Sequence, residues 1–312
     1  MLTSDDLAAR TARAVTAATA AGRDLGLHVD EPRVLYDVFS VIVHLAPSPV
    51  VVRVPTVLPA SVRSSPERQT AQQRAELSVA GWLTDRGLPV VPPSPLVPRE
   101  PVVLDGFSMT FWQYLDAVSD GEPDLAQRCA STAGLHAALR EYDGGGLGFF
   151  TQFETYIPAA LTELEHQPGL LDAADVQRAR QDWEHLAPVL TSRAGFEAAF
   201  PGVDVQPIHG DAPFHNMIPT ATGEYWSDFE LVTLGAVESD LALVGPEGHA
   251  AYDAAAVGLG LRALDERVLA VTESAALLAS VACLAMAPQL PMLVDALAPA
   301  VQSWRSRRAE RA

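Results

Sequence analysis

The chain contains no lysine. All 21 of its Lys and Arg residues are arginine, and they face 39 Asp and Glu residues, so the formal net charge is −18. Such a charge repels phosphate backbones, which argues against nucleic acid as a partner. Any task that proteins usually give to lysine falls here to arginine or is lost.

Cysteines and long apolar runs are also scarce. The two cysteines, Cys129 and Cys283, lie in separate helical patterns, which favours reduced core thiols over a disulfide and excludes a thiolate metal site. The longest near-continuous apolar run, Ala275 to Pro288, is shorter than the ~18 residues that span a bilayer. The first residues lack the apolar centre of a signal peptide. We therefore expect a cytoplasmic protein without a membrane partner.

The pattern of the chain predicts an α+β protein. With 312 residues, 48% hydrophobic and 19% charged, it is long enough for one large domain or two lobes. After a first helix over residues 5–21, strand patterns occur at 34–45, 50–54, 102–104 and 108–114, with a long helix at 65–83. Beyond residue 124 the pattern is mainly helical, with helices expected at 125–142, 153–165, 173–190, 252–263 and 265–286.

Negative charge is concentrated in the second part of the chain. Residues 1–116 carry 12 acids and 10 arginines, whereas residues 117–312 carry 27 acids and 11 arginines. The segment between Arg193 and Arg262 has ten carboxylates and no arginine. Because so many like charges are unfavourable without counterions, this segment indicates a bound metal or a cationic ligand.

One short segment carries recognisable chemistry. His209-Gly210-Asp211 is followed by Asn216, and Asp228-Phe229-Glu230 comes twelve residues after that. Phosphoryl transfer needs a carboxylate that takes the proton of the acceptor hydroxyl, together with oxygen ligands that hold magnesium against nucleotide phosphates. Asp211, Asn216 and Asp228 supply that set, on a loop that Gly210 forces out of regular structure.

These motifs resemble the aminoglycoside phosphotransferase and choline kinase-like family, which carries H-G-D-x-x-x-x-N and then D-F-E. Further stretches resemble the family's N-lobe helix and its exit, its hinge and the segment after the metal aspartate: 74–76, 82–89, 111–115 and 238–242. The resemblance covers about residues 30–250 in order. It implies a two-lobed protein-kinase-like fold. The N-terminal nucleotide-binding lobe, residues 1–116, has a small β-sheet and one long helix, and the C-terminal catalytic and acceptor-binding lobe, residues 117–312, is mainly helical.

The resemblance also implies roles for the motif residues. Asp211 corresponds to the catalytic base, and His209 orients the catalytic loop by hydrogen bonds. Asn216 and Asp228 correspond to the Mg²⁺ ligands. Asp240 is expected to support the loop backbone from below.

The nucleotide-binding side departs from the family in two places. The family usually has a lysine that touches the α- and β-phosphates and pairs with Glu76; here Arg53 must take that role, and a guanidinium can hold phosphate with two hydrogen bonds. No glycine occurs between Gly26 and Gly81, so the first hairpin lacks a flexible phosphate-covering loop, and main-chain amides near Ser40 are the substitute. Gln113 and Leu115 in the hinge complete the predicted nucleotide site.

Together these features predict a phosphotransferase that uses ATP or GTP and Mg²⁺ to phosphorylate a hydroxyl of a small molecule. The acidic C-terminal part favours a cationic, amine-bearing acceptor such as an aminoglycoside, another antibiotic or an amino sugar, which would connect the protein to antibiotic resistance. The alternative is a catalytically silent nucleotide-binding regulatory protein with a degraded N-lobe. Acceptor identity, the choice between ATP and GTP, and oligomeric state stay open.

Overall fold

The computed structural model describes residues 1–118 and 123–307, and the chain forms two compact units that are interleaved in sequence. Unit 1 consists of Met1–Val118, Ile218–Glu230 and Met286–Met292. Unit 2 consists of Ser119–Met217, Leu231–Ala285 and Leu293–Ala312. The lobe boundary expected after residue 116 stays a prediction, because each unit takes in segments from several parts of the chain.

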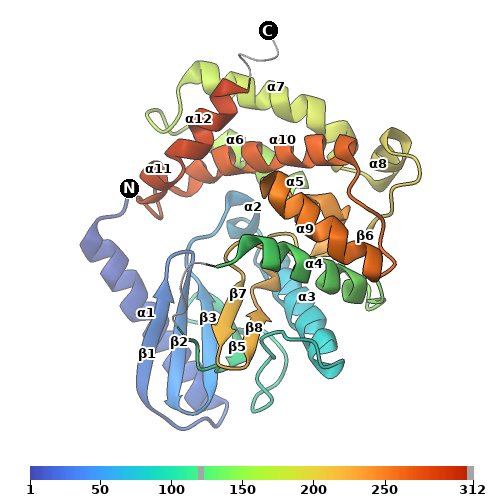
Figure 1. The fold of residues 1–312 in the computed structure, drawn as a ribbon. Coiled ribbons are helices and arrows are strands. Elements are labelled where there is room, and N and C mark those ends of the chain that lie inside the picture. The colour runs from blue at the N-terminus through green and yellow to red at the C-terminus, as the bar shows by residue number, and fades with distance from the viewer. Residues whose placement is uncertain (119–122, 308–312) are drawn as a thin grey trace. The chain divides into compact units, whose positions relative to one another are not determined.

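A five-stranded antiparallel sheet is the centre of unit 1 (Figure 1). Its strands are β1 (Val29–Asp37), β2 (Ser40–Pro47), β3 (Val50–Pro55), β4 (Val102–Leu104) and β5 (Phe107–Gln113). They lie in the order β1-β2-β3-β5-β4. The register pairs Ile42 with Arg53 and Arg53 with Thr110, so these three side chains lie on one face of the sheet.

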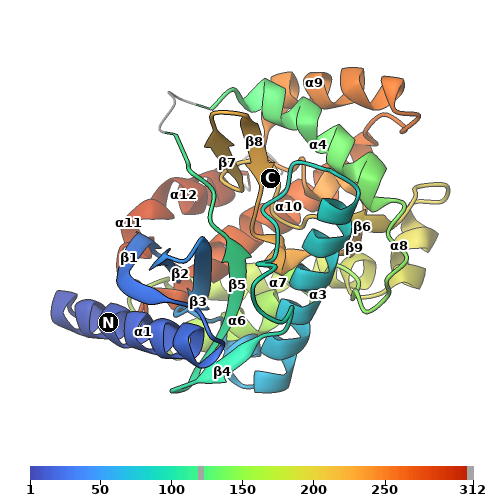
Figure 2. The same cartoon turned by 90° about the horizontal axis from the view of Figure 1, so that it is seen from below.

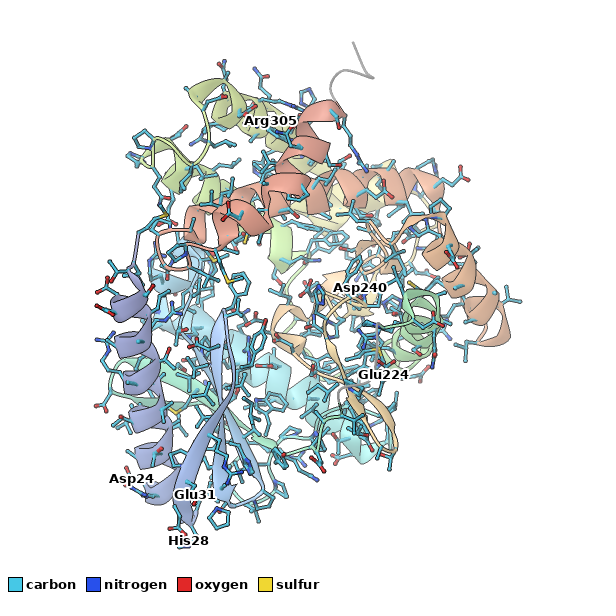
Figure 3. The ribbon with its side chains drawn as sticks, turned by 60° about the vertical axis from the view of Figure 1, so that its left-hand side comes forward. Asp24, His28, Glu31, Glu224, Asp240 and Arg305 are labelled. Carbon is cyan, nitrogen blue, oxygen red and sulfur yellow. The ribbon has the colours of Figure 1, made fainter. Side chains whose placement is uncertain are left out.

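Helix α1 (Ser4–Asp24) covers the opposite face of the sheet, as the blue ribbon in Figure 1 shows. It begins at a capping box between Thr3 and Asp6, which satisfies the first main-chain amides. Its buried alanines at 14, 17, 18 and 21 recur at helical spacing and pack against the valines of β2 and β3. Asp24, His28 and Glu31 mark the end of the unit where the chain passes from α1 into β1 (Figure 3).

Helices α2 (Ala60–Arg63) and α3 (Pro66–Asp85) follow β3. Ser65 caps α3 by accepting a hydrogen bond from the Arg68 amide, and Pro66 occupies the first turn, where its missing N–H costs nothing. The buried side of α3 includes Gln73, which donates to the Ser108 carbonyl of β5. Helix α3 is thereby fixed beside β5, as Figure 2 also shows.

Two later segments complete unit 1. The first contains most of the hairpin of β7 (Met217–Thr220) and β8 (Gly223–Trp226) and enters a 3₁₀ turn at Phe229–Leu231. The second is Met286–Met292, whose Gln289 side chain donates to the Leu58 carbonyl (2.9 Å) and accepts from the Leu58 amide (3.2 Å). The Gln289 carbonyl accepts a hydrogen bond from Arg10 of α1. This late segment is therefore bonded to the earliest parts of the chain.

Unit 2 is mainly helical, and its buried apolar side chains form a large hydrophobic cluster. Helices α4 and α9 lie side by side (Figures 1 and 2). A short two-stranded pair, β6 with β9, carries the loop described below. The elements are α4 (Leu125–Leu139), α5 (Thr151–Glu154), α6 (Tyr156–Glu165), α7 (Ala173–Leu190), α8 (Arg193–Ala199), β6 (Gln206–Ile208), β9 (Thr233–Gly235), α9 (Gly245–Gly258), α10 (Glu266–Ala282), α11 (Leu293–Ala296), α12 (Ala298–Ser306) and 3₁₀ turns at Val237–Ser239 and Cys283–Met286.

One helix differs clearly from its sequence-based prediction. The helix expected over 252–263 is α9, which runs from Gly245 to Gly258. Gly245 and Gly248 in the first turns weaken the helical signal there, and the apolar stretch after Gly258 belongs to the following loop. The strand expected over 34–45 is two strands, β1 and β2, joined by a turn at Val38 and Phe39. Strand β9 is absent from the prediction, because it forms by pairing with the distant β6.

The segment Glu266–Met286 is long and apolar enough, by length and composition alone, to cross a membrane. The expectation of no membrane-spanning helix rested on the length of an unbroken apolar run, and it stays a prediction. Half of the segment's most apolar stretch is buried inside the protein, and Val268, Ala275 and Leu278 belong to the core of unit 2. This burial is typical of the core helix of a globular domain.

Candidate functional site

The H-G-D loop begins where strand β6 ends. Gly210 has φ +90°, and a Cβ atom at this position would lie 2.1 Å from the Leu231 carbonyl oxygen. Only glycine accepts both the left-handed backbone and this close approach. The sharp turn at Gly210 places Asp211 beyond the end of the strand pair, where its carboxylate is exposed.

Asp240 holds the start of this loop. Its Oδ2 accepts a hydrogen bond from the His209 amide (2.9 Å), and its Oδ1 accepts one from the Gly210 amide (2.8 Å). His136 of α4 is bonded to the same Oδ2 at 2.9 Å through Nε2 and to the Tyr252 hydroxyl at 3.0 Å through Nδ1. Figure 3 shows Asp240 well inside the side chains of unit 2. Because both side chains of the Asp240–His136 pair are fully buried, water cannot replace these bonds.

Asn216 holds the far end of the loop against its beginning. Its side-chain Nδ2 donates to the main-chain oxygen of Asp211 (2.7 Å) and to Asp211 Oδ2 (2.9 Å). The amide nitrogen is thus engaged, and the amide oxygen is the atom left to serve as a ligand. His209, Asp211, Asn216 and Asp240 are therefore brought together, all in unit 2.

Two other predicted residues, Glu76 and Asp228, lie beside Arg53 in unit 1, and Arg53 is 7% exposed. Its Nη1 lies 3.6 Å from Glu76 Oε2, and its Nη2 lies 3.1 Å from Asp228 Oδ1 and bonds to Glu230 Oε2. Asp228 has φ 61°, a left-handed backbone that costs a non-glycine residue about 1 kcal/mol. One guanidinium thus faces three carboxylates. We call Arg53, Glu76, Asp228 and Glu230 the Arg53 cluster.

Charge in the Arg53 cluster is out of balance, and the pKa values reflect it. Burial works to lower the pKa of Arg53, but the carboxylates of Asp228, Glu230 and Glu76 outweigh burial and raise it above its usual range. Burial, helped by Asp228 and Glu230 and opposed by Arg53, raises the pKa of Glu76 to about 8. Arg53 is therefore always charged, and Glu76 holds a proton more readily than an exposed carboxyl does.

The excess negative charge bears on whether a metal fits here. Among the described residues, Glu76 Oε1, Glu76 Oε2 and Asp228 Oδ1 are buried oxygens that accept no hydrogen bond. Over the same part of the chain, no three His, Cys, Asp or Glu side chains form a metal cage by themselves. Magnesium suits this situation, because it is usually bound by one or two carboxylates together with phosphate oxygens and water. The buried carboxylate oxygen of Asp228 is a donor of the kind that this cation prefers.

The remaining predicted nucleotide residues lie on the sheet of unit 1. Ser40 is buried at the start of β2. Because β1 ends at Asp37, the turn of the first hairpin consists of Val38 and Phe39, and the Val38 amide donates to the Ser40 carbonyl. Gln113 ends β5 with an exposed side chain, and its amide donates to the Pro92 carbonyl. Leu115, just beyond β5, is half-buried. Their roles toward a nucleotide stay predictions.

The acidic segment between Arg193 and Arg262 is partly neutralised by the chain itself. Arg193 pairs with Glu197, Arg262 forms two hydrogen bonds with the fully buried Glu238, and Arg53 pairs with Asp228 and Glu230. Arginines that flank the segment or come from unit 1 thus meet four of its ten carboxylates. A bound cation is therefore not required for all of them.

Arg128, His136 and Tyr252 belong to no motif of the sequence. Arg128 and His136 occupy buried positions of α4, and Tyr252 is a fully buried residue of α9. Buried charged and imidazole side chains on an apolar helix face are the signal that could have found the first two, because such groups are seldom buried without partners. Tyr252 gives no such signal, since a buried tyrosine is ordinary core packing.

Comparisons with known proteins agree with the family that the motifs resemble. The model of the phosphotransferase enzyme family (APH) matches residues 40–278. No curated protein gave a significant sequence match.

Several solved structures have the same fold. The choline kinase LicA from Streptococcus pneumoniae is similar with a TM-score of 0.61 and 15% identity, covering 93% of this chain and 99% of that one. The GDP and kanamycin complex of APH(2")-IIia gives 0.60 and 14%, covering 95% and 98%. Macrolide 2'-phosphotransferase type I gives 0.53 and 17%, also covering 95% and 98%. At these identities the likeness shows the protein-kinase-like fold, with an antiparallel sheet toward the N-terminus and a helical C-terminal region.

The family match spans most of the chain and includes both the H-G-D loop and the D-F-E segment. The resemblance inferred from the motifs is thereby confirmed. The chain belongs to the phosphotransferase enzyme family, and it is a small-molecule kinase that uses an alcohol group as acceptor.

Proposed function

We propose that the protein transfers the γ-phosphate of ATP or GTP, with Mg²⁺, to a hydroxyl of a small amine-bearing molecule. The observation that carries this proposal is the loop of unit 2, in which Asp211 is bonded to Asn216 and the preceding amides are bonded to Asp240. This arrangement holds a carboxylate at a fixed place where an acceptor hydroxyl can be deprotonated.

Each residue has a distinct task in this proposal. Asp211 accepts the proton of the attacking hydroxyl, and His209, whose amide is bonded to Asp240, keeps the loop in place. Arg53 binds the α- and β-phosphates, and Glu76 keeps its guanidinium oriented. Asn216 and Asp228 would hold the magnesium ion, which supplies charge neutralisation for the phosphates.

A base-binding role is assigned to the end of β5 and a phosphate-covering role to the start of β2. Gln113 and Leu115 would contact the base through their main chain, and the amides near Ser40 would lie over the phosphates. Neither contact favours ATP over GTP on physical grounds. Both nucleotides are therefore included in the test below.

The amine-bearing acceptor is supported by charge. Asp204, Glu247 and Asp253 add to the negative potential of unit 2 and make no ion pair with arginine among the described residues. Such a potential would concentrate a cation at low salt. Choline and kanamycin, named with two of the similar structures, both carry positive charge. The internal arginine pairs described above make this support weaker than the ten carboxylates alone would indicate.

A second function is favoured by one observation. Arg53 stands where the family has lysine, and three carboxylates already occupy its guanidinium. A protein whose phosphate-binding cation is held in this way could bind nucleotide without transferring phosphate. The second candidate is therefore a catalytically silent nucleotide-binding regulatory protein.

One experiment separates the two functions. A library of hydroxyl compounds, both cationic and neutral, is incubated with the protein, Mg²⁺ and either [γ-³²P]ATP or [γ-³²P]GTP, with Asp211→Asn as the matched control. Transfer to a cationic compound by the wild type and not by the variant supports the proposal. Magnesium-dependent nucleotide binding by calorimetry without transfer to any compound would support the silent alternative instead.

A further inference from the structure

Arg128 of α4 is a buried arginine, 5% exposed, whose guanidinium reaches the H-G-D loop. Its Nη1 donates to the Phe214 carbonyl oxygen at 2.6 Å, and its Nη2 donates to the Met217 carbonyl oxygen at 3.5 Å. These two carbonyls bracket His215 and Asn216 in the chain. One side chain therefore holds both ends of the short turn that carries Asn216.

The turn in question controls the direction of Asp211. Asn216 donates through Nδ2 to both the main-chain oxygen and the Oδ2 atom of Asp211. If the backbone between 214 and 217 moved, these two hydrogen bonds would lengthen, and the hold of Asn216 on the Asp211 carboxylate would weaken. A chain of contacts thus runs from Arg128 through the main chain to Asn216 and on to Asp211.

The shape of the arginine side chain suits this task. A guanidinium is a flat fork with five N–H donors, so it can bond to two carbonyls that lie three residues apart. A lysine ammonium is a compact charge that would reach one of the two carbonyls well and the other poorly. The hydrogen bond from Arg128 to the Met217 carbonyl is already long, so the arginine side chain is near the limit of its reach.

We propose that Arg128 is a positioning residue of the phosphotransfer loop: by holding the Phe214 and Met217 carbonyls it fixes Asn216, and through Asn216 it fixes Asp211. The assignment rests on the proposed function for its catalytic meaning. Its mechanical part, the hold on the loop, can be measured without any activity.

The chain offers a closely matched control in Arg178 of α7. Arg178 also lies in unit 2 and also donates to two main-chain carbonyls, those of Trp304 (2.6 Å) and Arg305 (3.3 Å). Neither carbonyl belongs to the H-G-D loop. Arg178→Gln therefore removes the same kind of bond as Arg128→Gln and serves to subtract the general loss of stability.

The first test is hydrogen–deuterium exchange of the backbone amides in the wild type, Arg128→Gln and Arg178→Gln. We expect Arg128→Gln to raise exchange in residues 211–217 by about 10-fold, because local opening becomes easier. Arg178→Gln should leave that segment unchanged. Equal exchange of residues 211–217 in all three proteins would overturn the proposal, whether or not the protein is active. Arg128→Lys, which keeps a buried cation, replaces Arg128→Gln if the latter does not fold.

The second test is kinetic and uses whichever acceptor the wild type accepts. Arg128→Gln should lower kcat by about 10- to 100-fold and change the acceptor KM by less than about twofold, since misplaced catalytic groups affect turnover more than binding. Arg128→Lys should recover part of the loss. In an Asn216→Ala background, Arg128→Gln should cost almost nothing further.

The outcomes of the two tests separate this proposal from the proposed function. Independent, multiplying losses for Arg128 and Asn216, or an Arg178→Gln variant with the same kcat loss, would overturn the positioning role. A wild type that phosphorylates no acceptor would instead contradict the proposed function. The exchange measurement then still decides whether Arg128 holds the loop.

Discussion

The H-G-D loop of unit 2 and the Arg53 cluster of unit 1 differ in how completely their buried carboxylates are hydrogen-bonded. Around the loop, Asp240 accepts bonds from two main-chain amides and is bonded to His136, so its charge is well compensated. Around Arg53, Glu76 is fully buried and accepts no hydrogen bond from any described residue. In the loop, the Asp240 carboxylate has its hydrogen-bond partners within the protein. In the cluster, the Glu76 carboxylate accepts no hydrogen bond from a described residue and could bind a donor of a ligand.

The largest expected effect concerns the H-G-D loop. Asp211→Asn removes the proton acceptor and keeps the shape, so turnover should fall by about 100-fold or more. Nucleotide affinity should stay nearly unchanged, because Asp211 is not among the residues proposed to bind phosphate. Steady-state kinetics and calorimetric nucleotide binding check both parts. A variant that keeps more than about a tenth of wild-type turnover would show that Asp211 is not the base.

The next prediction concerns the Arg53 cluster. Asp228→Ala removes a proposed magnesium ligand, so magnesium-dependent nucleotide binding and turnover should fall together. EDTA added to the wild type should reproduce the loss of binding. Calorimetric titrations of nucleotide at several Mg²⁺ concentrations measure the effect, and an unchanged magnesium dependence would mean that Asp228 holds no metal.

A third prediction concerns stability and sharpens the contrast. Asp240→Ala leaves the His209 and Gly210 amides and the His136 ring without their buried acceptor, so the free energy of unfolding should fall by about 3–5 kcal/mol. Glu76→Ala should cost much less, since that carboxylate accepts no bond that would be lost. Urea unfolding of both variants gives the comparison. Equal losses would show that the two regions do not differ in this way.

A fourth prediction treats Arg53 and Glu76 as one unit. Arg53→Ala should weaken nucleotide binding by about 10-fold or more, and Glu76→Ala should do so less, because only Arg53 would touch phosphate. In a double-mutant cycle the two effects should be non-additive. Nucleotide titrations of the four proteins provide the numbers, and simple additivity would mean that Glu76 does not orient Arg53.

The last prediction is a pH dependence of the protein without nucleotide. The pKa of Glu76 is raised from 4.5 to about 8, so between these values the folded protein keeps a proton that the unfolded chain releases. The free energy of unfolding should therefore decrease as the pH rises from about 4.5 to about 8, and this contribution should be absent in Glu76→Gln. Unfolding curves across this range measure it, with the exposed Glu67→Gln on the same helix as control. Parallel profiles for wild type and Glu76→Gln would contradict the raised pKa.

Much of the fold was predictable because its signals are local. Helix α7 begins and ends at the expected residues, with Asp172 as a cap that the Asp175 amide bonds to. The turn between β4 and β5 is also a local signal: an Asp-Gly pair favours a tight hairpin turn, and Asp105 and Gly106 both adopt the positive φ that such a turn needs. Strand β9 exists through its pairing with β6, and that long-range contact leaves no local pattern.

The candidate site divides in the same way. Asp211, Asn216 and Asp228 stand at fixed spacing in two short motifs, so the sequence alone could single them out. Tyr252 of α9 bonds to His136 from 116 residues away in the chain, and Arg128 of α4 bonds to the Phe214 carbonyl from 86 residues away. Nor could the sequence predict that Glu230 would also bond to Arg53, because this depends on how the 3₁₀ turn after Asp228 directs its side chain.

The hydrogen bonds that join Gln289 to Leu58 and Arg10 have a consequence for how the protein is made. A ribosome that has synthesised the sheet and α3 has not yet synthesised Ile218–Glu230 or Met286–Met292, which belong to the same unit. Domains usually fold in order as they emerge, starting from the N-terminus. Unit 1 can be completed only after Met292 has been synthesised, so its apolar strands lack their last contacts during most of translation.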